Sequence, residues 1–426
     1  MGSIFEDLES EVRSYSRAWP TVFDRASGGR LYAEDGTPYV DFFCGAGALN
    51  YGHNHPVIKH ALLEYLAEDR VVHSLDMGTA AKRAFLERFW DTALKPRGLD
   101  YKVQFPGPTG TNAVEAALKL ARKVTGRELV VGFTNAFHGM TLGALSVTGN
   151  AMKRGGAGVP LSHSTSVPFC NFLEDDVDSI GILRALLEGN GSGLDLPAAV
   201  IVETVQGEGG INVASGPWLR KVADLCAEHG ILLVVDDVQM GCGRTGPFFS
   251  FEDSGVVPDI VTMAKSLSGI GLPLAVTLMR RDLDVWQPGE HNGTFRGNNP
   301  AMVTATAALS LWEDGSMTDE VAVRGAVVRE RLAAVAAEVA ADRPDVAVEV
   351  RGKGLVWGLA LPGTDLAARV AREAFDRGVL VETSGPDDEV VKVMPPLVAS
   401  IEDELEPGLA SLALAVRHVV REDTRP

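Results

Sequence analysis

Two apolar runs, each ending in a charged residue, constrain the fold of this chain most strongly. Residues 231–235 lead directly into Asp236, and residues 260–264 lead into Lys265. Short apolar runs followed by glycine-containing loops are typical of strands buried on both faces, as in a parallel sheet covered by helices. Because neighbouring parallel strands end at the same edge, Asp236 and Lys265 are predicted to face one cleft, where open α/β sheets bind ligands.

An acid and an amine at one edge of a sheet suit pyridoxal phosphate. The lysine amine forms a Schiff base with the cofactor aldehyde, and the acid keeps the pyridine nitrogen protonated so that the ring withdraws electrons. For an isolated Asp236 and Lys265, a structural ion pair or two solvated strand ends is the commoner explanation. The surrounding sequence therefore has to decide between the two interpretations.

Length, charge and cysteine content exclude several classes of protein. The 426 residues are enough for a large core and two domains, and 46% hydrophobic content is typical of a soluble globular protein. A net charge of −18 argues against nucleic acid or an anionic membrane as partner, because phosphates would be repelled. The four cysteines lack paired spacing, and neither a secretory pattern nor a membrane-length apolar run is present. We therefore expect a cytoplasmic protein.

The order of strand and helix patterns changes along the chain. From about residue 102 to 280 they alternate, which predicts an α/β fold with a large, mostly parallel sheet covered by helices. The C-terminal part reads instead as a small α+β unit that also draws on the N-terminus. The expected division is 1–75 (small domain), 76–318 (large domain) and 319–426 (small domain).

Small residues before a predicted helix suggest a phosphate site. Residues 105–115 contain Gly110, Thr111 and Thr109 and lead into the amphipathic helix 116–122. Free backbone N–H groups and the helix dipole would point at an anion, and threonine hydroxyls can add donors. An ordinary N-cap, common for threonine and asparagine, explains the same residues equally well.

Other polar and aromatic residues follow the predicted strands. Phe137, after the strand 129–133, is able to stack on a planar ring or to lie in the core. The carboxylates of Glu203 and Glu208 would line the same cleft or be solvated. His53 and His55 lack a third ligand, so we predict no metal site and expect His55 to cap the next helix.

Taken together, these motifs resemble those of the class III pyridoxal-phosphate-dependent aminotransferases of fold type I. The resemblance covers essentially the whole chain, and its most specific part is 233–246, followed at the family's interval by Lys265. Other matching stretches are 109–115, 137–139, 203–210, 293–298 and 351–355. Within the class, the stretches most similar to the diaminobutyrate-forming transaminases of ectoine biosynthesis are 49–56, 95–105, 267–273 and 289–299.

This resemblance implies transfer of an amino group from L-glutamate to L-aspartate 4-semialdehyde, giving L-2,4-diaminobutyrate and 2-oxoglutarate. Pyridoxal 5'-phosphate would be the cofactor and a homodimer or larger homo-oligomer the working unit. An ornithine, acetylornithine or 4-aminobutyrate transaminase is the alternative, against which Met140 and Lys392 argue. A non-catalytic binding protein on the same fold is a third interpretation, which the presence of Lys265 and the absence of a basic DNA-binding extension disfavour.

The resemblance also implies individual roles. Lys265 would be the catalytic lysine and proton shuttle, and Asp236 would pair with the pyridinium nitrogen. Thr294 would reach the phosphate bound by the neighbouring subunit. The expected cofactor contacts are Gly110 and Thr111 (phosphate), Phe137 (ring face), His138, Gln239 (phenolic oxygen), Asp236, Lys265 and Thr294.

Substrate binding is where the sequence departs from the family pattern. Glu208 matches a glutamate that gates an arginine, but Lys392 stands at the arginine's position. A lysine offers a point charge in place of a bidentate fork. Met140 replaces an arginine that grips dicarboxylates in ornithine-type members, so Arg296 is a further candidate for binding substrate.

Overall fold

The computed structural model describes residues 4–173 and 177–423. Its centre is a seven-stranded sheet in which only β12 (Val276–Arg280) runs against its neighbours, and the other strands are parallel to one another. In spatial order the strands are β4 (Tyr101–Gln104), β12 (Val276–Arg280), β11 (Ile260–Met263), β10 (Leu232–Asp236), β7 (Ala199–Val202), β5 (Val130–Phe133) and β6 (Ser164–Val167). The predicted mostly parallel sheet is confirmed.

Alternate residues of the central strands are buried on opposite faces of this sheet. Leu232 and Val234 of β10 belong to a core cluster with helix α6 (Gly110–Thr125). Leu233 and Val235 of the same strand belong to the main core, together with residues of helix α10 (Gly216–His229). Because both faces are covered, the strand is apolar at every position up to Asp236, which explains the uninterrupted run in the sequence.

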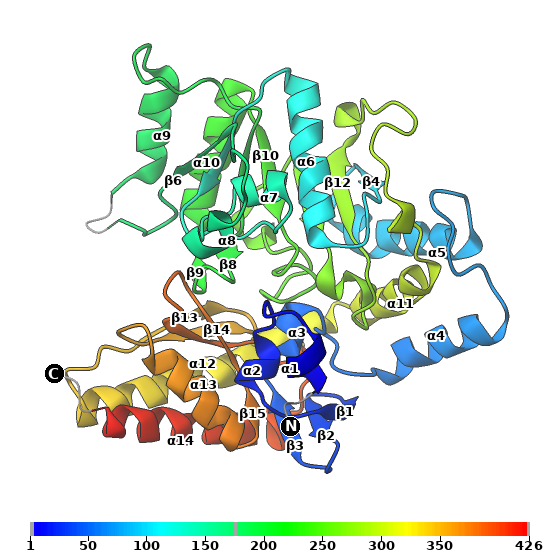
Figure 1. Ribbon diagram of the computed structural model, residues 1–426. Coiled ribbons are helices and arrows are strands. Elements are labelled where there is room, and N and C mark those ends of the chain that lie inside the picture. The colour runs from blue at the N-terminus through cyan, green and yellow to red at the C-terminus, as the bar shows by residue number, and fades with distance from the viewer. Residues whose placement is uncertain (1–3, 174–176, 424–426) are drawn as a thin grey trace.

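A smaller unit lies beside this sheet and draws on both ends of the chain (Figure 1). Strand β15 (Val379–Leu380) pairs in parallel with β3 (Pro38–Asp41), which joins the C-terminal part to the N-terminal part. One small sheet contains β1 (Phe23–Ser27), β2 (Arg30–Ala33), β3 (Pro38–Asp41) and β15 (Val379–Leu380). The other contains β13 (Glu349–Lys353), β14 (Val356–Ala360), β17 (Val390–Val393) and β16 (Glu382–Ser384).

Helices complete both units. The longest, α12, begins at Ser316 and therefore spans the expected boundary at 318, which stays a prediction, as does the boundary at 75. With the small sheets lie α12 (Ser316–Asp342), α13 (Leu366–Asp376) and α14 (Glu406–Glu422). Elsewhere the helices include α1 (Ile4–Leu8), α2 (Tyr15–Ala18), α4 (Pro56–Ala67), α5 (Ala80–Phe89), α7 (Leu142–Ser146), α8 (Ala151–Gly155), α9 (Ser179–Glu188) and α11 (Asn299–Leu309).

The histidine loop has a structural explanation that differs in part from the prediction. His55 occupies the N-cap position of α4 as expected, but its side chain makes no capping hydrogen bond. A histidine ring is larger than the serine, threonine or aspartate groups that reach back to the first turn. His53 Nε2 lies 2.8 Å from Asp41 Oδ2 and ties this loop to β3.

Within residues 4–173 and 177–423, no helix is long and apolar enough to cross a membrane.

Candidate active site

A cavity of about 480 Å³ opens at the carboxyl ends of β7, β10 and β11. Most of the predicted site residues line it, although they come from segments far apart in the sequence. The predicted residues in its wall are Gly110, Thr111, Phe137, His138, Glu208, Asp236, Gln239 and Lys265, together with Met140. The structure therefore brings the acid, the amine and the glycine-rich turn together at one edge of the sheet.

Lys265 lies where the chain leaves β11 and turns into the short 3-10 helix η4 (Lys265–Ser268). Its φ of +49° is left-handed, a conformation that costs a residue other than glycine about 1 kcal/mol or more. Burial lowers the pKa of the Lys265 amine, and the nearby charge of Lys392 adds to this effect while that of Glu208 opposes it. A lowered pKa favours the neutral amine, which is the nucleophilic form.

The carboxylate of Asp236 is held by three donors and retains room for one more. Oδ1 accepts hydrogen bonds from Thr262 Oγ1 (2.9 Å) and from the backbone N–H of Val238 (3.2 Å). Oδ2 lies 2.7 Å from His138 Nδ1. A carboxylate offers about four acceptor positions, so Oδ2 keeps one for a donor in the cavity. Thr262 is in place because the parallel register sets it directly beside Asp236.

Buried titratable groups surround this carboxylate. Burial lowers the pKa of His138, but the hydrogen bond to Asp236 and the negative charges of Asp236 and Glu203 together outweigh burial and raise that pKa above its usual value. Burial raises the pKa of the Glu203 carboxyl to about 7. Glu203 Oε1 accepts a hydrogen bond from the backbone N–H of Phe137 at 2.9 Å. This bond fixes the backbone of Phe137, and its ring lines the cavity.

The N-terminus of α6 reaches the cavity as the sequence suggested. Thr109 takes the N-cap position, and its backbone N–H and hydroxyl both donate to Asn112 Oδ1. A Cβ added to Gly110 would lie only 2.7 Å from Val238 Cγ1, so no side chain fits there without a shift. Gly110 and Thr111, in the first turn of this helix of 16 residues, line the cavity, so the helix N-terminus can meet an anion there.

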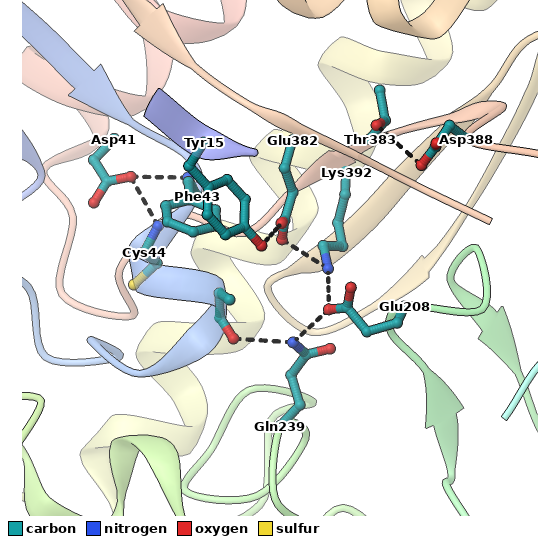
Figure 2. A network of polar contacts seen from close by, with 11 residues as sticks. Tyr15, Asp41, Phe43, Cys44, Glu208, Gln239, Glu382, Thr383, Asp388 and Lys392 are labelled. Carbon is teal, nitrogen blue, oxygen red and sulfur yellow. Dashed lines mark hydrogen bonds and ion pairs between the residues drawn. The ribbon is translucent and has the colours of Figure 1, made fainter. Parts of the chain in front are cut away.

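Glu208 and Lys392 form the centre of a polar cluster beside the cavity (Figure 2). Lys392 Nζ lies 2.8 Å from Glu208 Oε1 and 2.7 Å from Glu382 Oε1. Gln239 Nε2 donates to Glu208 Oε1 at 3.1 Å, and the Tyr15 hydroxyl donates to Glu382 Oε2 at 3.0 Å. The lysine side chain is 0% exposed, so both carboxylates compensate a fully buried charge.

The charges in this cluster stabilise one another. Burial opposes ionisation of Glu208, but the charges of Lys392 and Lys265 outweigh it and hold the pKa of Glu208 well below its usual value. Burial also opposes the charge on Lys392, yet Glu208 and Glu382 raise its pKa above the usual value. The pKa of Glu382 is raised, chiefly by burial. An ionised Glu208–Lys392 pair follows from these directions.

Sequence reasoning missed Glu382 and Tyr15 as members of this cluster. Glu382 follows the apolar residues 379–381, and an acid that interrupts a buried strand is a signal of a charged partner inside. Its partner was predictable only from strand register, because Glu382 lies directly opposite Lys392 in the β16–β17 pair. Tyr15 is 367 residues away from Glu382 in the sequence and gave no signal.

Thr294 and Arg296 lie outside the cavity of this single chain. Thr294 is exposed in the 3-10 helix η6 (Thr294–Arg296), and its carbonyl oxygen is 2.8 Å from His73 Nε2. Arg296 Nη2 is 2.5 Å from Asp76 Oδ2. The contribution of either residue to a site therefore stays a prediction.

A known protein family matches nearly the whole chain. The family model for aminotransferase class III matches residues 12–416, so this chain belongs to the class III aminotransferases. A relative from Streptomyces coelicolor named diaminobutyrate–2-oxoglutarate transaminase is 62% identical over 417 residues, covering 97% of each chain. A relative of the same name from Virgibacillus pantothenticus is 55% identical, covering 98% of this chain and 99% of its own.

Solved structures agree on the fold. Ornithine aminotransferase from Toxoplasma gondii superposes with a TM-score of 0.83 at 27% identity, covering 98% of this chain and 94% of its own. An amine transaminase from an uncultivated Pseudomonas species, solved in a PLP-bound form, superposes with a TM-score of 0.82 at 26% identity, covering 97% of each chain. The fold is that of the fold type I transferases, and the family indicates pyridoxal phosphate as cofactor.

The cavity fits this cofactor. Its phosphate is a dianion that requires several hydrogen-bond donors. The start of α6 can provide backbone N–H donors, and Gly110 has no side chain there. Its protonated pyridine nitrogen requires an anionic acceptor, and Asp236 Oδ2 has the one acceptor position that the protein leaves open. Its aldehyde requires an amine, and Lys265 is in the same wall.

Proposed function

We propose that this chain transfers an amino group from L-glutamate to L-aspartate 4-semialdehyde, giving L-2,4-diaminobutyrate and 2-oxoglutarate. In the cell this would be the first committed step towards ectoine. One observation carries the proposal: relatives named diaminobutyrate–2-oxoglutarate transaminase are 52–62% identical over nearly the whole chain. An ornithine-type activity is less well supported, because the ornithine aminotransferase structure is only 27% identical.

Each predicted cofactor contact has a task in this proposal. Asp236 would hold the proton on the pyridine nitrogen, Gln239 would contact the phenolic oxygen, and Phe137 would cover one face of the ring. His138 would orient Asp236 through their 2.7 Å contact. Gly110 and Thr111 would hold the phosphate. When bound, pyridoxal phosphate supplies an electron-withdrawing ring and a carbonyl that carries the amino group from donor to acceptor.

Lys265 would move the proton that transamination requires. Its amine takes a proton from the reacting carbon of glutamate as a general base. It gives a proton to the reacting carbon of the acceptor as a general acid. The lowered pKa of the amine supports this role, since a neutral amine is available to take the proton.

The pair of Glu208 and Lys392 would respond to the difference between the two substrates. Glutamate carries a carboxylate on its reacting carbon, whereas the semialdehyde carries a hydrogen there. A carboxylate would displace Glu208 and pair with Lys392, and in its absence Glu208 would return to the lysine at 2.8 Å. Glu382 would keep Lys392 in position throughout, from the other side. This mechanism assigns no step to Arg296, which pairs with Asp76.

The working unit would be a homodimer in which Thr294 reaches the phosphate site of the partner. An exposed apolar surface supports this proposal: Val71, Val72, Leu75, Met77 and Phe295 are all exposed. The two segments that carry these side chains lie side by side, since the backbone of residues 72–74 bonds to that of residues 297–299. Clustered exposed apolar side chains are typical of protein interfaces, and Thr294 is next to Phe295 in this surface.

A cytoplasmic location is part of the same proposal, and the four cysteines support it because all are buried and unpaired.

The test of the function is a substrate comparison with purified protein loaded with pyridoxal phosphate. Glutamate plus aspartate 4-semialdehyde should give diaminobutyrate with a kcat/KM at least tenfold above that for ornithine or 4-aminobutyrate as amino donor, a selectivity of about 1.4 kcal/mol. Equal or faster turnover of ornithine or 4-aminobutyrate would overturn the assignment.

A further inference from the structure

A second cavity adjoins the one that contains Asp236 and Lys265. Its volume is about 350 Å³, and it shares Phe137 and Glu208 with the main cavity. Its wall also includes Lys153, Thr383 and Asp388. A small substrate that reacts beside Phe137 would therefore extend its far end towards Lys153 and Asp388.

Lys153 carries a positive charge in this wall. It is half-buried on α8, and its Nζ lies 4.4 Å from the centroid of the Phe137 ring. No carboxylate among residues 4–173 and 177–423 forms an ion pair with it. Lys392, by contrast, is held by two carboxylates, and Lys265 is the amine for the cofactor. Lys153 is thus the cation that this part of the wall can offer to an incoming anion.

Asp388 is the complementary anion. Its Oδ1 accepts a hydrogen bond from Thr383 Oγ1 at 3.3 Å (Figure 2). No lysine or arginine in the described part of the chain pairs with it. Within the described part of the chain, the second cavity therefore presents one lysine, Lys153, and two aspartates, Asp387 and Asp388, that form no ion pair. A cation and an anion in one wall are the pattern that recognises a zwitterion.

The two proposed substrates share one group at their far ends. In glutamate, the side-chain carboxylate is separated from the reacting carbon by the same number of bonds as the carboxylate of aspartate 4-semialdehyde is from its aldehyde carbon. A single cation can therefore hold the far carboxylate of both substrates. Only the semialdehyde, and the diaminobutyrate formed from it, carries an ammonium group beside that carboxylate.

We propose that the second cavity is the subsite for the far end of both substrates, with Lys153 binding the shared carboxylate and Asp388 binding the ammonium group of the semialdehyde. The inference rests on the proposed function and deepens it. It also explains how the main cavity tolerates the uncharged Met140, since the cation comes from α8 instead. Lys392 and Glu208 are then concerned only with the carboxylate on the reacting carbon of glutamate.

The test compares Lys153→Met and Lys153→Arg with the wild-type enzyme. In Lys153→Met, the KM values for glutamate and for aspartate 4-semialdehyde should each rise about 10-fold to 100-fold, the range for a charge-assisted hydrogen bond. The preference for glutamate over L-alanine, which has no far carboxylate, should fall by the same factor. Calorimetry should show an equal loss of affinity for glutarate, an unreactive dicarboxylate. Lys153→Arg should recover most of each loss.

Asp388→Asn separates the ammonium contact from the carboxylate contact. This variant should raise the KM for aspartate 4-semialdehyde about 10-fold while leaving the Kd of glutarate within about twofold of wild type. An equal loss for glutamate and L-alanine in Lys153→Met would show that Lys153 only supports the Phe137 ring, and would overturn the subsite. An unchanged glutamate KM in Lys153→Met would also overturn the subsite, provided that the wild-type enzyme makes diaminobutyrate. Absence of diaminobutyrate from the wild-type reaction would instead overturn the proposed function itself.

Discussion

At the scale of single residues, Lys265 and Asp236 owe their proposed chemistry to neighbours that their own sequence positions do not disclose. Asp236 keeps one acceptor position open because Thr262, Val238 and His138 fill the others. The amine of Lys265 has a lowered pKa because the fold buries it near Lys392. The two residues were predictable from the strand ends, whereas their hydrogen-bond partners depend on register.

Lys265→Ala should lose at least about 100-fold in kcat, because general acid–base catalysis by one side chain contributes at least that much. The fold should be retained, with a melting temperature close to that of Lys102→Ala, a control at an exposed ion pair. In the wild-type enzyme, borohydride reduction followed by peptide mass spectrometry should find the cofactor on the peptide that contains Lys265. A label on any other lysine would contradict the assignment.

Asp236→Asn should keep bound cofactor but lose most of its activity, about 100-fold or more in kcat, because a neutral amide does not hold the ring nitrogen protonated. Stability should also fall, since the contact with His138 is weakened. The adjacent carboxyl of Asp237 provides a matched control, because it lies outside the cavity wall. Activity in Asp236→Asn as high as in Asp237→Asn, with cofactor bound, would refute the role.

At the scale of elements, the start of α6 links sequence to site most directly. Gly110→Ala should raise the Kd for cofactor about 10-fold or more, because the new Cβ would lie 2.7 Å from Val238 Cγ1 and displace the turn proposed to hold the phosphate. Gly155→Ala is the control, since a Cβ there meets nothing within 4 Å. Titration of each apoenzyme with pyridoxal phosphate measures the Kd of the two variants. Equal affinities in the two variants would remove Gly110 from the phosphate site.

Elements buried on both faces were the most predictable from sequence. Strands β7, β10 and β11 read as apolar runs because helices cover both sides of them. The edge strand β6 and the two-residue strands β8 (Val205–Gln206) and β9 (Asn212–Val213) gave no such pattern, since they bury less apolar surface. The Glu382–Lys392 contact depends on the pairing of β16 with β17, which sequence patterns do not specify.

At the scale of the whole molecule, buried carboxyls make stability depend on pH. Burial raises the pKa of Asp237 to about 7, and the charge of Asp236 adds to this effect. A carboxyl with a raised folded-state pKa contributes stability below its unfolded value, near 4, and loses it as pH rises through about 7. Asp237→Asn removes this titration.

The melting temperature of Asp237→Asn apoenzyme, relative to wild type, should therefore rise by about 2 °C or more between pH 5 and pH 8. Calorimetric scans at several pH values measure this difference. Glu203→Gln should show the same trend, because the pKa of Glu203 is also raised to about 7. A difference that stays constant or falls with pH would show that Asp237 is ionised in the folded protein.

The proposed dimer makes cofactor binding depend on Thr294 of the neighbouring chain. If Thr294 completes the partner's phosphate site, then Thr294→Ala should weaken cofactor binding more than folding. If it affects only its own loop, about 1 kcal/mol of stability should be lost and cofactor affinity kept. Heterodimers with two purification tags separate these outcomes. One chain is wild type and the other carries Lys265→Ala with Thr294→Ala, so the intact Lys265 site faces the altered loop and should bind cofactor about 10-fold more weakly. A heterodimer with Lys265→Ala alone is the control, and equal affinity in the two would place Thr294 outside the partner's site.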